Sequence, residues 1–311
     1  MYATRSKETA DSVLIVGSMA FDDLELPTVN AKDVVGGAAT YAAYAASLFA
    51  PVRIVAVVGE DFPKTVLEEL AERDVDCAGV EHAKGKTFRW VGRYAANLAS
   101  RETLDTQLNV FADFRPKLPP SFVDSPFVLL GNIQPQLQLD VLSQVKAPRF
   151  VAADTMNFWI SGERKKLGEV LAKIDTLMIN DEELRQLADI HNIRRAAAAV
   201  RKLGPKRLIV KRGEYGAMLF DDEGVFFTPA YPLEDEVDPT GAGDSFAGAL
   251  LGYLAAAGSL DGASMRRGLR LASAVASFCV EGVGPSKLQA VQRADVMIRL
   301  EALRSITKTG G

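Results

Sequence analysis

The strongest constraint on the fold is a regular alternation of short apolar runs with longer helical patterns along the 311 residues. The runs are rich in β-branched residues, and several end in glycine or a polar residue, as is typical of buried parallel strands. They cover residues 13–17, 52–58, 127–130, 150–153, 176–179 and 207–210. This alternation predicts a doubly wound α/β fold, with a mainly parallel central sheet flanked by helices. No repeat or low-complexity linker divides the chain, so we expect one domain over residues 1–311.

Composition argues against several classes of function. The chain is 48% hydrophobic and 24% charged, with a formal net charge of −4, which does not suit binding to nucleic acid or to an anionic membrane. No apolar run is long enough to span a membrane, and residues 1–11 lack the apolar core of a signal peptide. Cys77 and Cys279 are predicted to be buried reduced thiols, and two histidines leave little basis for a histidine metal site. We therefore expect a cytoplasmic protein.

The chemistry concentrates in residues 238–244, DPTGAGD, which precede an apolar pattern at helical spacing. Gly241, Ala242 and Gly243 leave the backbone N–H groups of the helix start uncovered, and such a start binds anions. Asp244 follows in the first turn of the same helix. A carboxylate there repels a bound anion unless it acts on a hydroxyl that attacks the anion, which is the role of a base in phosphoryl transfer. The alternative is a helix cap without catalytic function.

The seven-residue string resembles the C-terminal signature of the ribokinase-like (PfkB) sugar and nucleoside kinases, D-x-T-G-A-G-D. The resemblance extends from Gly17 to Gly284. It implies a ribokinase-like fold with a small β-lid, formed here by about residues 22–36 and 85–111. It also implies transfer of the γ-phosphoryl group of ATP, together with Mg²⁺, to a hydroxyl of a small substrate, with Asp244 as the base. A homodimer through the lid is a further expectation.

On the substrate side, the resemblance selects Asp22, which follows the first strand and would accept hydrogen bonds from neighbouring hydroxyls. Gly36 and Gly37 match the paired glycines at which the family's backbone approaches a ligand. Where the family commonly has an asparagine, this chain has Tyr41. Either a hydroxyl of Thr40 or Tyr41 would replace the amide, or the Tyr41 ring would stack on a nucleobase.

The residues that the resemblance places near the nucleotide come from several separate segments. They are Asn157, Asn180, Glu183, Lys211, Gly213, Gly216 and Thr240. Glu183 would position Mg²⁺ indirectly, because this ion prefers oxygen ligands and keeps several waters. Helix capping alone also explains the motif formed by Asn180 and Glu183. A monovalent cation such as K⁺, held by carbonyls near Asp238, Thr240 and Val283, is a further candidate ligand.

The substrate itself is left open by the sequence. A monosaccharide is the leading candidate, and a nucleoside or a cyclitol such as inositol is the alternative within the family. Asn132, just after the apolar run 127–130, is another candidate substrate contact, whereas Arg89 and Arg93 are expected to lie mostly in solvent. A catalytically silent sugar- or nucleotide-sensing module is the alternative from another class. A Rossmann dehydrogenase is discarded because no GxGxxG motif follows the first strand.

Overall fold

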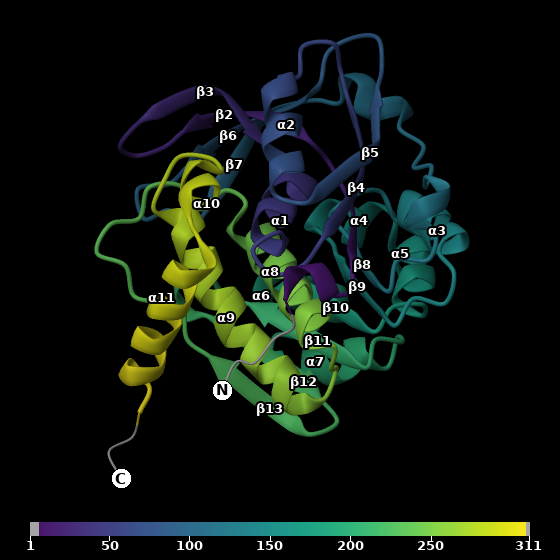
Figure 1. Cartoon of the computed structure of the whole chain (residues 1–311). Coiled ribbons are helices and arrows are strands. Elements are labelled where there is room, and N and C mark those ends of the chain that lie inside the picture. Colours follow the sequence, from purple (N-terminus) through teal and green to yellow (C-terminus); the bar gives the residue numbers. More distant parts are fainter. Residues whose placement is uncertain (1–5, 309–311) are drawn as a thin grey trace.

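The computed structural model describes residues 6–308, which form a large nine-stranded sheet covered by helices and a smaller four-stranded sheet (Figure 1). The large sheet has the order β13-β12-β11-β10-β9-β8-β1-β4-β5. Its strands are β1 (Val13–Val16), β4 (Val52–Val58), β5 (Val75–His82), β8 (Phe127–Leu130), β9 (Phe150–Asp154), β10 (Thr176–Asn180), β11 (Arg207–Lys211), β12 (Ala217–Asp221) and β13 (Gly224–Thr228). Among these described strands, the antiparallel pairs are β11 with β12 and β12 with β13, and the other pairs are parallel. The predicted mainly parallel α/β fold is confirmed.

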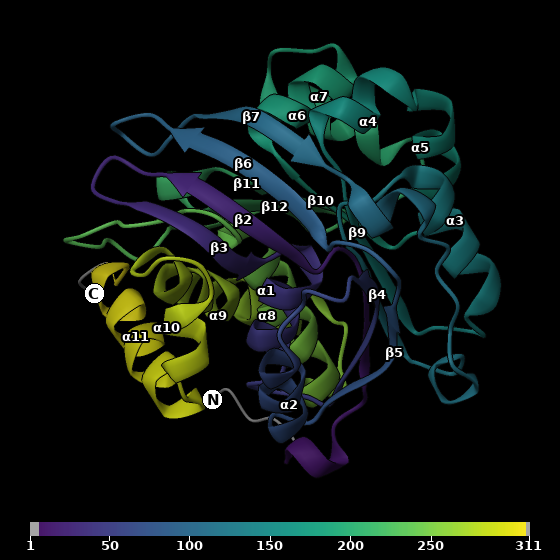
Figure 2. The same ribbon diagram turned by 90° about the horizontal axis from the view of Figure 1, so that it is seen from above.

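Successive side chains of a strand point to opposite faces of the sheet, so the apolar residues of the large sheet are divided between two cores. In β1, Val13 and Ile15 enter one core, and Leu14 and Val16 enter the other. The first core is covered by α1 (Ala38–Ala46), α2 (Lys64–Glu72), α8 (Ala242–Ala257), α9 (Gly262–Val280), α10 (Ser286–Ala290) and α11 (Arg293–Ile306). The second is covered by α3 (Pro135–Gln144), α4 (Asn157–Gly162), α5 (Arg164–Leu171), α6 (Asp181–Ala188) and α7 (Ile193–Arg201). Figure 2 shows these two helical layers on opposite sides of the large sheet.

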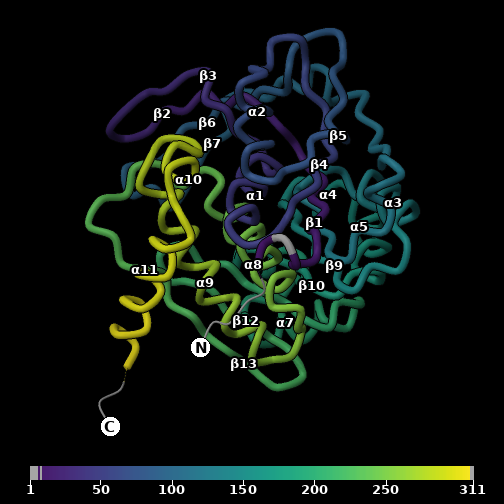
Figure 3. The backbone as a smooth tube through the Cα atoms, viewed as in Figure 1, coloured from purple at the N-terminus to yellow at the C-terminus, as the bar shows by residue number. Residues whose placement is uncertain are grey.

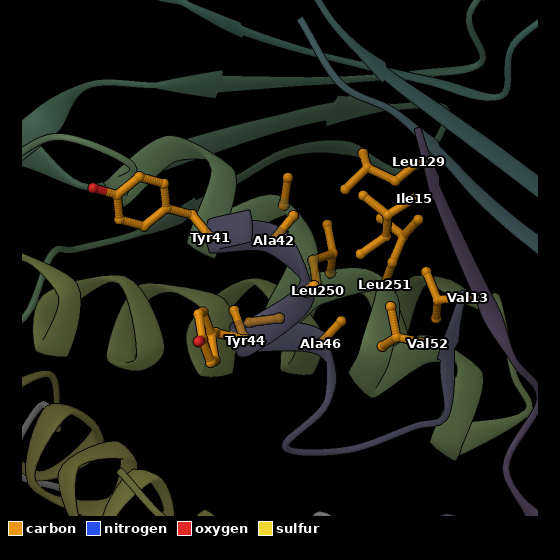
Figure 4. Close-up of a cluster of buried hydrophobic side chains, with 14 of the residues drawn as sticks. Val13, Ile15, Tyr41, Ala42, Tyr44, Ala46, Val52, Leu129, Leu250 and Leu251 are labelled. Atoms are coloured by element: carbon orange, nitrogen blue, oxygen red, sulfur yellow. The ribbon is translucent and has the colours of Figure 1, made fainter. Parts of the chain in front are cut away.

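Small residues set the distance between α1 and α8. A Cβ on Gly248 would overlap the Ala42 carbonyl, and one on Gly252 would lie 2.6 Å from the Ala46 carbonyl. The two helices therefore pack closely, and Leu250 of α8 joins Ile15 of β1 in the first core (Figure 4). This packing places the start of α1 beside the start of α8, where the candidate site lies.

The small sheet has the order β3-β2-β6-β7 and matches the predicted β-lid. Its strands are β2 (Ala20–Glu25), β3 (Asn30–Gly36), β6 (Phe88–Tyr94) and β7 (Arg101–Gln107). The chain enters it twice, after β1 and after β5, as the tube in Figure 3 shows. Leu24, Leu26 and Tyr94 form a separate small core, against which Val283 of the C-terminal loop packs. The lid is thereby held against the loop after α9, in which the Gly284 N–H donates to Asp238 of the DPTGAGD string.

Several local predictions were incomplete or wrong. The prediction missed β5, an edge strand with mixed burial, and the helices α4 and α5. Residues 286–306 form two helices, α10 and α11, because the chain is extended at Val291. Val110 and Phe111, expected to continue the lid, lie in the 3₁₀ helix Asn109–Asp113 and pack against the second core. Both cysteines are free thiols, but only Cys279 is fully buried, since Cys77 is half-buried.

Candidate active site

The predicted site residues meet where neighbouring parallel strands end and α8 begins. Asp154 ends β9, Asn180 ends β10 and Lys211 ends β11. The register aligns Asn180 with Lys211, and Met178 of the same strand with Asp154. Because the carboxyl ends of parallel strands share one edge of the sheet, these polar side chains come together there.

An anion cradle forms at the first residues of α8. Gly241 is its N-cap and has a φ of +76°, in the left-handed region that favours glycine. A Cβ there would also overlap the Tyr41 ring. The N–H of Ala242 donates to the Pro239 carbonyl at 3.2 Å, which leaves the N–H groups of Gly241 and Gly243 as the candidate donors to an anion.

Asp238 fixes the loop that leads into the cradle. Its carboxylate is fully buried and accepts hydrogen bonds from the N–H groups of Thr240, at 2.9 Å, and Gly284, at 2.8 Å. Burial raises the pKa of this carboxyl, and these hydrogen bonds oppose the rise. Asp238 therefore holds together the loop before α8 and the loop after α9, between which the monovalent cation was predicted.

Lys211 brings a positive charge to the cradle. Its Nζ forms an ion pair with Asp154 Oδ2 at 2.6 Å, with both side chains largely buried. The same Nζ lies 3.0 Å from the position that a Cβ on Gly243 would occupy. Burial lowers the pKa of Lys211, but the charges of Asp154 and Asp244 outweigh it and raise the pKa overall. The lysine is thus held protonated beside the anion cradle.

Two carboxyl groups face this lysine with raised pKa values. Burial, and next the charge of Asp154, raise the pKa of Asp244 to about 6, although Lys211 lowers it. The same two causes raise the pKa of Glu183 to about 7, against the opposing hydrogen bond from Asn180. A carboxyl with a pKa near 6 is ionised at neutral pH and yet accepts a proton readily, which suits a general base.

Asp22 lies on the lid side of the site and is 4% exposed. Its carboxyl rests against Gly36, where any Cβ would overlap Oδ2. Burial raises the pKa of Asp22 to about 8, and the charges of Asp238 and Asp244 add to the rise. Gly36 therefore makes room for the Asp22 carboxyl, and its backbone contact with substrate stays a prediction.

Comparison with known proteins identifies this arrangement. The sequence matches the family described as "pfkB family carbohydrate kinase" over residues 11–290. The chain belongs to this kinase family. It is a phosphotransferase with an alcohol group as acceptor, and it binds ATP.

Individual relatives support the family and the fold. A cytidine kinase from Thermococcus kodakarensis is 29% identical over 248 residues, which is 78% of this chain and 88% of that protein. Arabidopsis thaliana ribokinase, solved with ribose and ATP, has a TM-score of 0.76 at 24% identity, over 94% of this chain and 99% of that one. An E. coli protein solved with ATP and Mg²⁺ has a TM-score of 0.77 at 21% identity, over 94% and 99% of the two chains.

Three residues that were predicted on the substrate side make contacts within the protein. Thr40 is fully buried, and its hydroxyl donates to the Gly36 carbonyl at 2.7 Å. Tyr41 is 1% exposed, with its ring against Gly241, so it is not placed to stack on a nucleobase. Gly37 has a φ of +93° and packs against the Ser18 carbonyl, which accepts the Ala39 N–H at 2.9 Å. These residues shape the start of α1 instead of lining an open substrate pocket.

Asn132 and Asn157 flank the site without entering the carboxylate cluster. The Asn132 amide accepts from Trp159 Nε1 at 3.0 Å and donates to the Met156 sulfur at 3.2 Å. Asn157 is exposed at the first position of α4, and its side-chain oxygen accepts the Phe158 N–H at 3.0 Å. Asn132 thus positions α4, and a ligand contact by either asparagine stays a prediction.

The remaining nucleotide-side residues divide into structural and open positions. Asn180 and Glu183 form a reciprocal capping box: Asn180 Oδ1 accepts the Glu183 N–H at 2.8 Å, and Glu183 Oε2 accepts the Asn180 N–H at 3.0 Å. Gly216 has a φ of +87° and packs on the Thr228 carbonyl, so it is required by the hairpin. Gly213 is exposed with open space around its Cα, which leaves it accessible to a nucleotide.

Sequence reasoning missed three residues of the site. Asp154, at the end of β9, pairs with Lys211 and influences both Asp244 and Glu183. Tyr94 of β6 shares a hydrogen bond of 2.9 Å with the Thr240 hydroxyl. Arg101 of β7 is an exposed residue, and Tyr94, followed by the charges of Glu183 and Asp244, raises the pKa of its guanidinium.

The arginines that the sequence singled out lie elsewhere. Arg89 pairs with Asp23 and Asp33, and Arg93 pairs with Glu25, on the outer face of the lid. The Arg93 pair is exposed, as expected, whereas the side chains of Arg89 and Asp23 are only 22% and 21% exposed. Within residues 6–308, no helix is long and apolar enough to cross a membrane, and no group of three or more His, Cys, Asp or Glu side chains is arranged to hold a metal ion.

Proposed function

We propose that this kinase transfers the γ-phosphoryl group of MgATP to a hydroxyl of a small polyhydroxylated acceptor, with Asp244 as the general base. The observation that carries the proposal is the position of Asp244 in the first turn of α8, beside Gly241 and Gly243 and facing Lys211. This arrangement combines donors for a developing negative charge with a carboxylate that can accept the proton of the attacking hydroxyl.

Each residue has a defined part in the proposed reaction. Asp22 accepts hydrogen bonds from hydroxyls next to the reacting one and so fixes its direction. Asp244 takes the proton from the attacking hydroxyl, and the N–H groups of Gly241 and Gly243 stabilise the transferring group. The lid, formed by β2, β3, β6 and β7, excludes water and so suppresses hydrolysis of ATP. A homodimer through this lid stays a prediction.

The nucleotide side fits a magnesium-bound triphosphate. Lys211 and the cradle supply positive charge, and Glu183 offers the carboxylate oxygen atoms that Mg²⁺ prefers. The capping box occupies Oε2 of Glu183, so this residue would act on Mg²⁺ through water or through Oε1. When bound, Mg²⁺ neutralises charge on the phosphates. Asn157, Asn180, Gly213 and Thr240 complete the proposed nucleotide site.

A monosaccharide is the first proposed acceptor, with the ribose of a nucleoside as the second candidate. The nucleoside is favoured by the similarity to the Thermococcus kodakarensis cytidine kinase over 78% of this chain. Both acceptors present neighbouring hydroxyls to Asp22, and they differ only in whether a base must also be accommodated. An inositol acceptor offers the same hydroxyl pattern and belongs in the same test.

A monovalent cation is part of the proposal because of one buried group. The Tyr41 hydroxyl is buried, and no hydrogen-bond partner for it is present within residues 6–308. It lies near Gly284 and Asp238, at the loops where carbonyls near Asp238, Thr240 and Val283 would hold K⁺. K⁺ should raise the melting temperature more than the same concentration of a bulky organic cation, and Tyr41→Phe should reduce that difference.

The function is tested by ADP release with MgATP across monosaccharides, nucleosides and cyclitols. We expect one acceptor class to give acceptor-dependent ADP release, and Asp244→Asn to lower kcat by at least about 10²-fold while ATP still binds. Asp181→Asn is the matched control, because Asp181 also lies in the first turn of a helix but pairs with Arg185 away from the cradle. Turnover of Asp244→Asn near the wild-type rate would refute the assignment of the base.

A further inference from the structure

The lid presents two different faces because its strands alternate. In β6, Trp90 and Tyr94 lie on one face, with the Trp90 indole over Gly92, whereas Arg89 and Arg93 lie on the other. The antiparallel register places Arg101 of β7 directly opposite Tyr94. Side chains of directly opposed residues share a face, so Arg101 lies on the same face as Tyr94.

This face is turned toward the anion cradle. The Tyr94 hydroxyl meets the Thr240 hydroxyl at 2.9 Å, one residue before Gly241. The Arg101 guanidinium hydrogen-bonds with Tyr94, and its carbon lies 5.6 Å from the centre of the Trp90 ring. Two aromatic side chains therefore hold the guanidinium above the cradle.

The charge of Arg101 acts where the acceptor and nucleotide sides meet. Burial raises the pKa values of Asp22, Glu183 and Asp244, and Arg101 opposes the rise at each of them. Arg89 and Arg93 are each neutralised by two carboxylates within 4 Å. In contrast, no carboxylate of residues 6–308 forms an ion pair with Arg101, whose charge is thus available to a ligand.

We propose that Arg101 is a catalytic residue that binds the transferring phosphoryl group from the lid side, opposite the N–H groups of Gly241 and Gly243. The inference rests on the proposed function. The acceptor oxygen forms a bond to the γ-phosphorus, the bond from that phosphorus to the β,γ-bridging oxygen breaks, and ADP leaves with the electron pair. The proton of the acceptor passes to Asp244. Arg101 stabilises the charge on the equatorial oxygens, and a guanidinium matches phosphate geometry with two parallel N–H donors.

Three variants of the full-length protein test this role. Arg101→Met removes the charge, Arg101→Lys retains it without the paired donors, and Arg93→Met removes an arginine from the outer face of the same lid. We expect Arg101→Met to lower kcat by about 10²–10³-fold, the effect of losing one donor to a developing charge. Arg101→Lys should be intermediate, added guanidinium ion should partly restore Arg101→Met, and Arg93→Met should remain within about threefold of wild type.

Calorimetric binding of ATP and ADP separates this proposal from the proposed function. Wild type should prefer ATP over ADP, and Arg101→Met should lose most of that preference while Arg93→Met keeps it. If wild type binds ATP in preference to ADP but phosphorylates no acceptor, the proposed function fails. The role of Arg101 in γ-phosphate binding is then still tested, by whether Arg101→Met loses the preference for ATP. The proposal is overturned if Arg101→Met retains the kcat and ATP preference of Arg93→Met. It is also overturned if the loss is confined to KM for acceptors that carry a carboxylate, because Arg101 would then recognise the acceptor.

Discussion

Replacing Asp22 by asparagine should stabilise the protein while impairing its function. The Asp22 carboxyl is 4% exposed, and burial raises its pKa to about 8 from an ordinary value of 3.8. At neutral pH the unfolded chain carries this group ionised, whereas the folded chain must hold it largely protonated. Asparagine has similar size and carries no charge in either state, so it avoids this penalty.

The sign and size follow from proton linkage. A folded-state pKa above the unfolded value means that the folded protein binds the extra proton, so stability falls as pH rises from about 4 to about 8. With about 1.36 kcal/mol per unit, the penalty is about 2 kcal/mol at pH 5 and about 4 kcal/mol at pH 7. Asp22→Asn should therefore raise the free energy of unfolding, and its advantage should grow by about 2–3 kcal/mol between pH 5 and pH 7.

Urea denaturation of both proteins at the two pH values measures this difference directly. Asp23→Asn is the control, because Asp23 is the neighbouring residue but pairs with Arg89 at 2.6 Å on the outer face of the lid. It should lower the free energy of unfolding, by at most about 1 kcal/mol. An advantage of Asp22→Asn that is equal at pH 5 and pH 7 would show that Asp22 is ionised in the folded protein, and the argument from burial would be refuted.

Two further predictions concern the cradle. Lys211→Met should raise the pKa of Asp244, because the charge of Lys211 lowers it. The acid limb of the pH profile of kcat/KM should therefore move from about pH 6 to higher pH. An unchanged acid limb would show that Lys211 does not influence the pKa of the base. Gly241→Ala should cost about 2–6 kcal/mol of stability in thermal or urea denaturation, from left-handed backbone strain and overlap with Tyr41. Gly213→Ala should cost far less stability, because Gly213 also has a positive φ but no atom lies close to the position of its Cβ. If both variants lose the same stability, overlap with Tyr41 does not contribute to the cost of Gly241→Ala.

The sequence was sufficient for the features that depend on local pattern. Buried strands such as β1 and β4 are continuous apolar runs, and the helix start at residues 241–243 follows from its glycines and the apolar spacing after it. Asp22 and Asp244 were found because each lies at a fixed distance from such an element. The lid was located from the resemblance, since its strands are partly exposed and give only weak alternation.

Side-chain roles that depend on long-range register could not be predicted. Asp154 reaches Lys211 only because β9, β10 and β11 are aligned in one sheet, and the two residues are 57 positions apart. Tyr41 was expected to meet a ligand because it occupies the position at which the family commonly has an asparagine. Its burial depends instead on the close approach of α1 to α8, which Gly248 and Gly252 permit from more than 200 residues away.

The arginines of the lid show how a single shift in register decides chemistry. Every residue of β7 is exposed, so no apolar pattern marks which of its side chains face the site. A bulge between Val91 and Gly92 changes the pairing, and it places Arg101 opposite Tyr94 while Glu102 opposes Arg93. Without that shift, the alternation of β7 relative to β6 would be reversed. Arg101 would then lie among the outer ion pairs, and Glu102 would bring a negative charge toward the cradle. The bulge therefore determines the sign of the charge that the lid presents to the phosphoryl group.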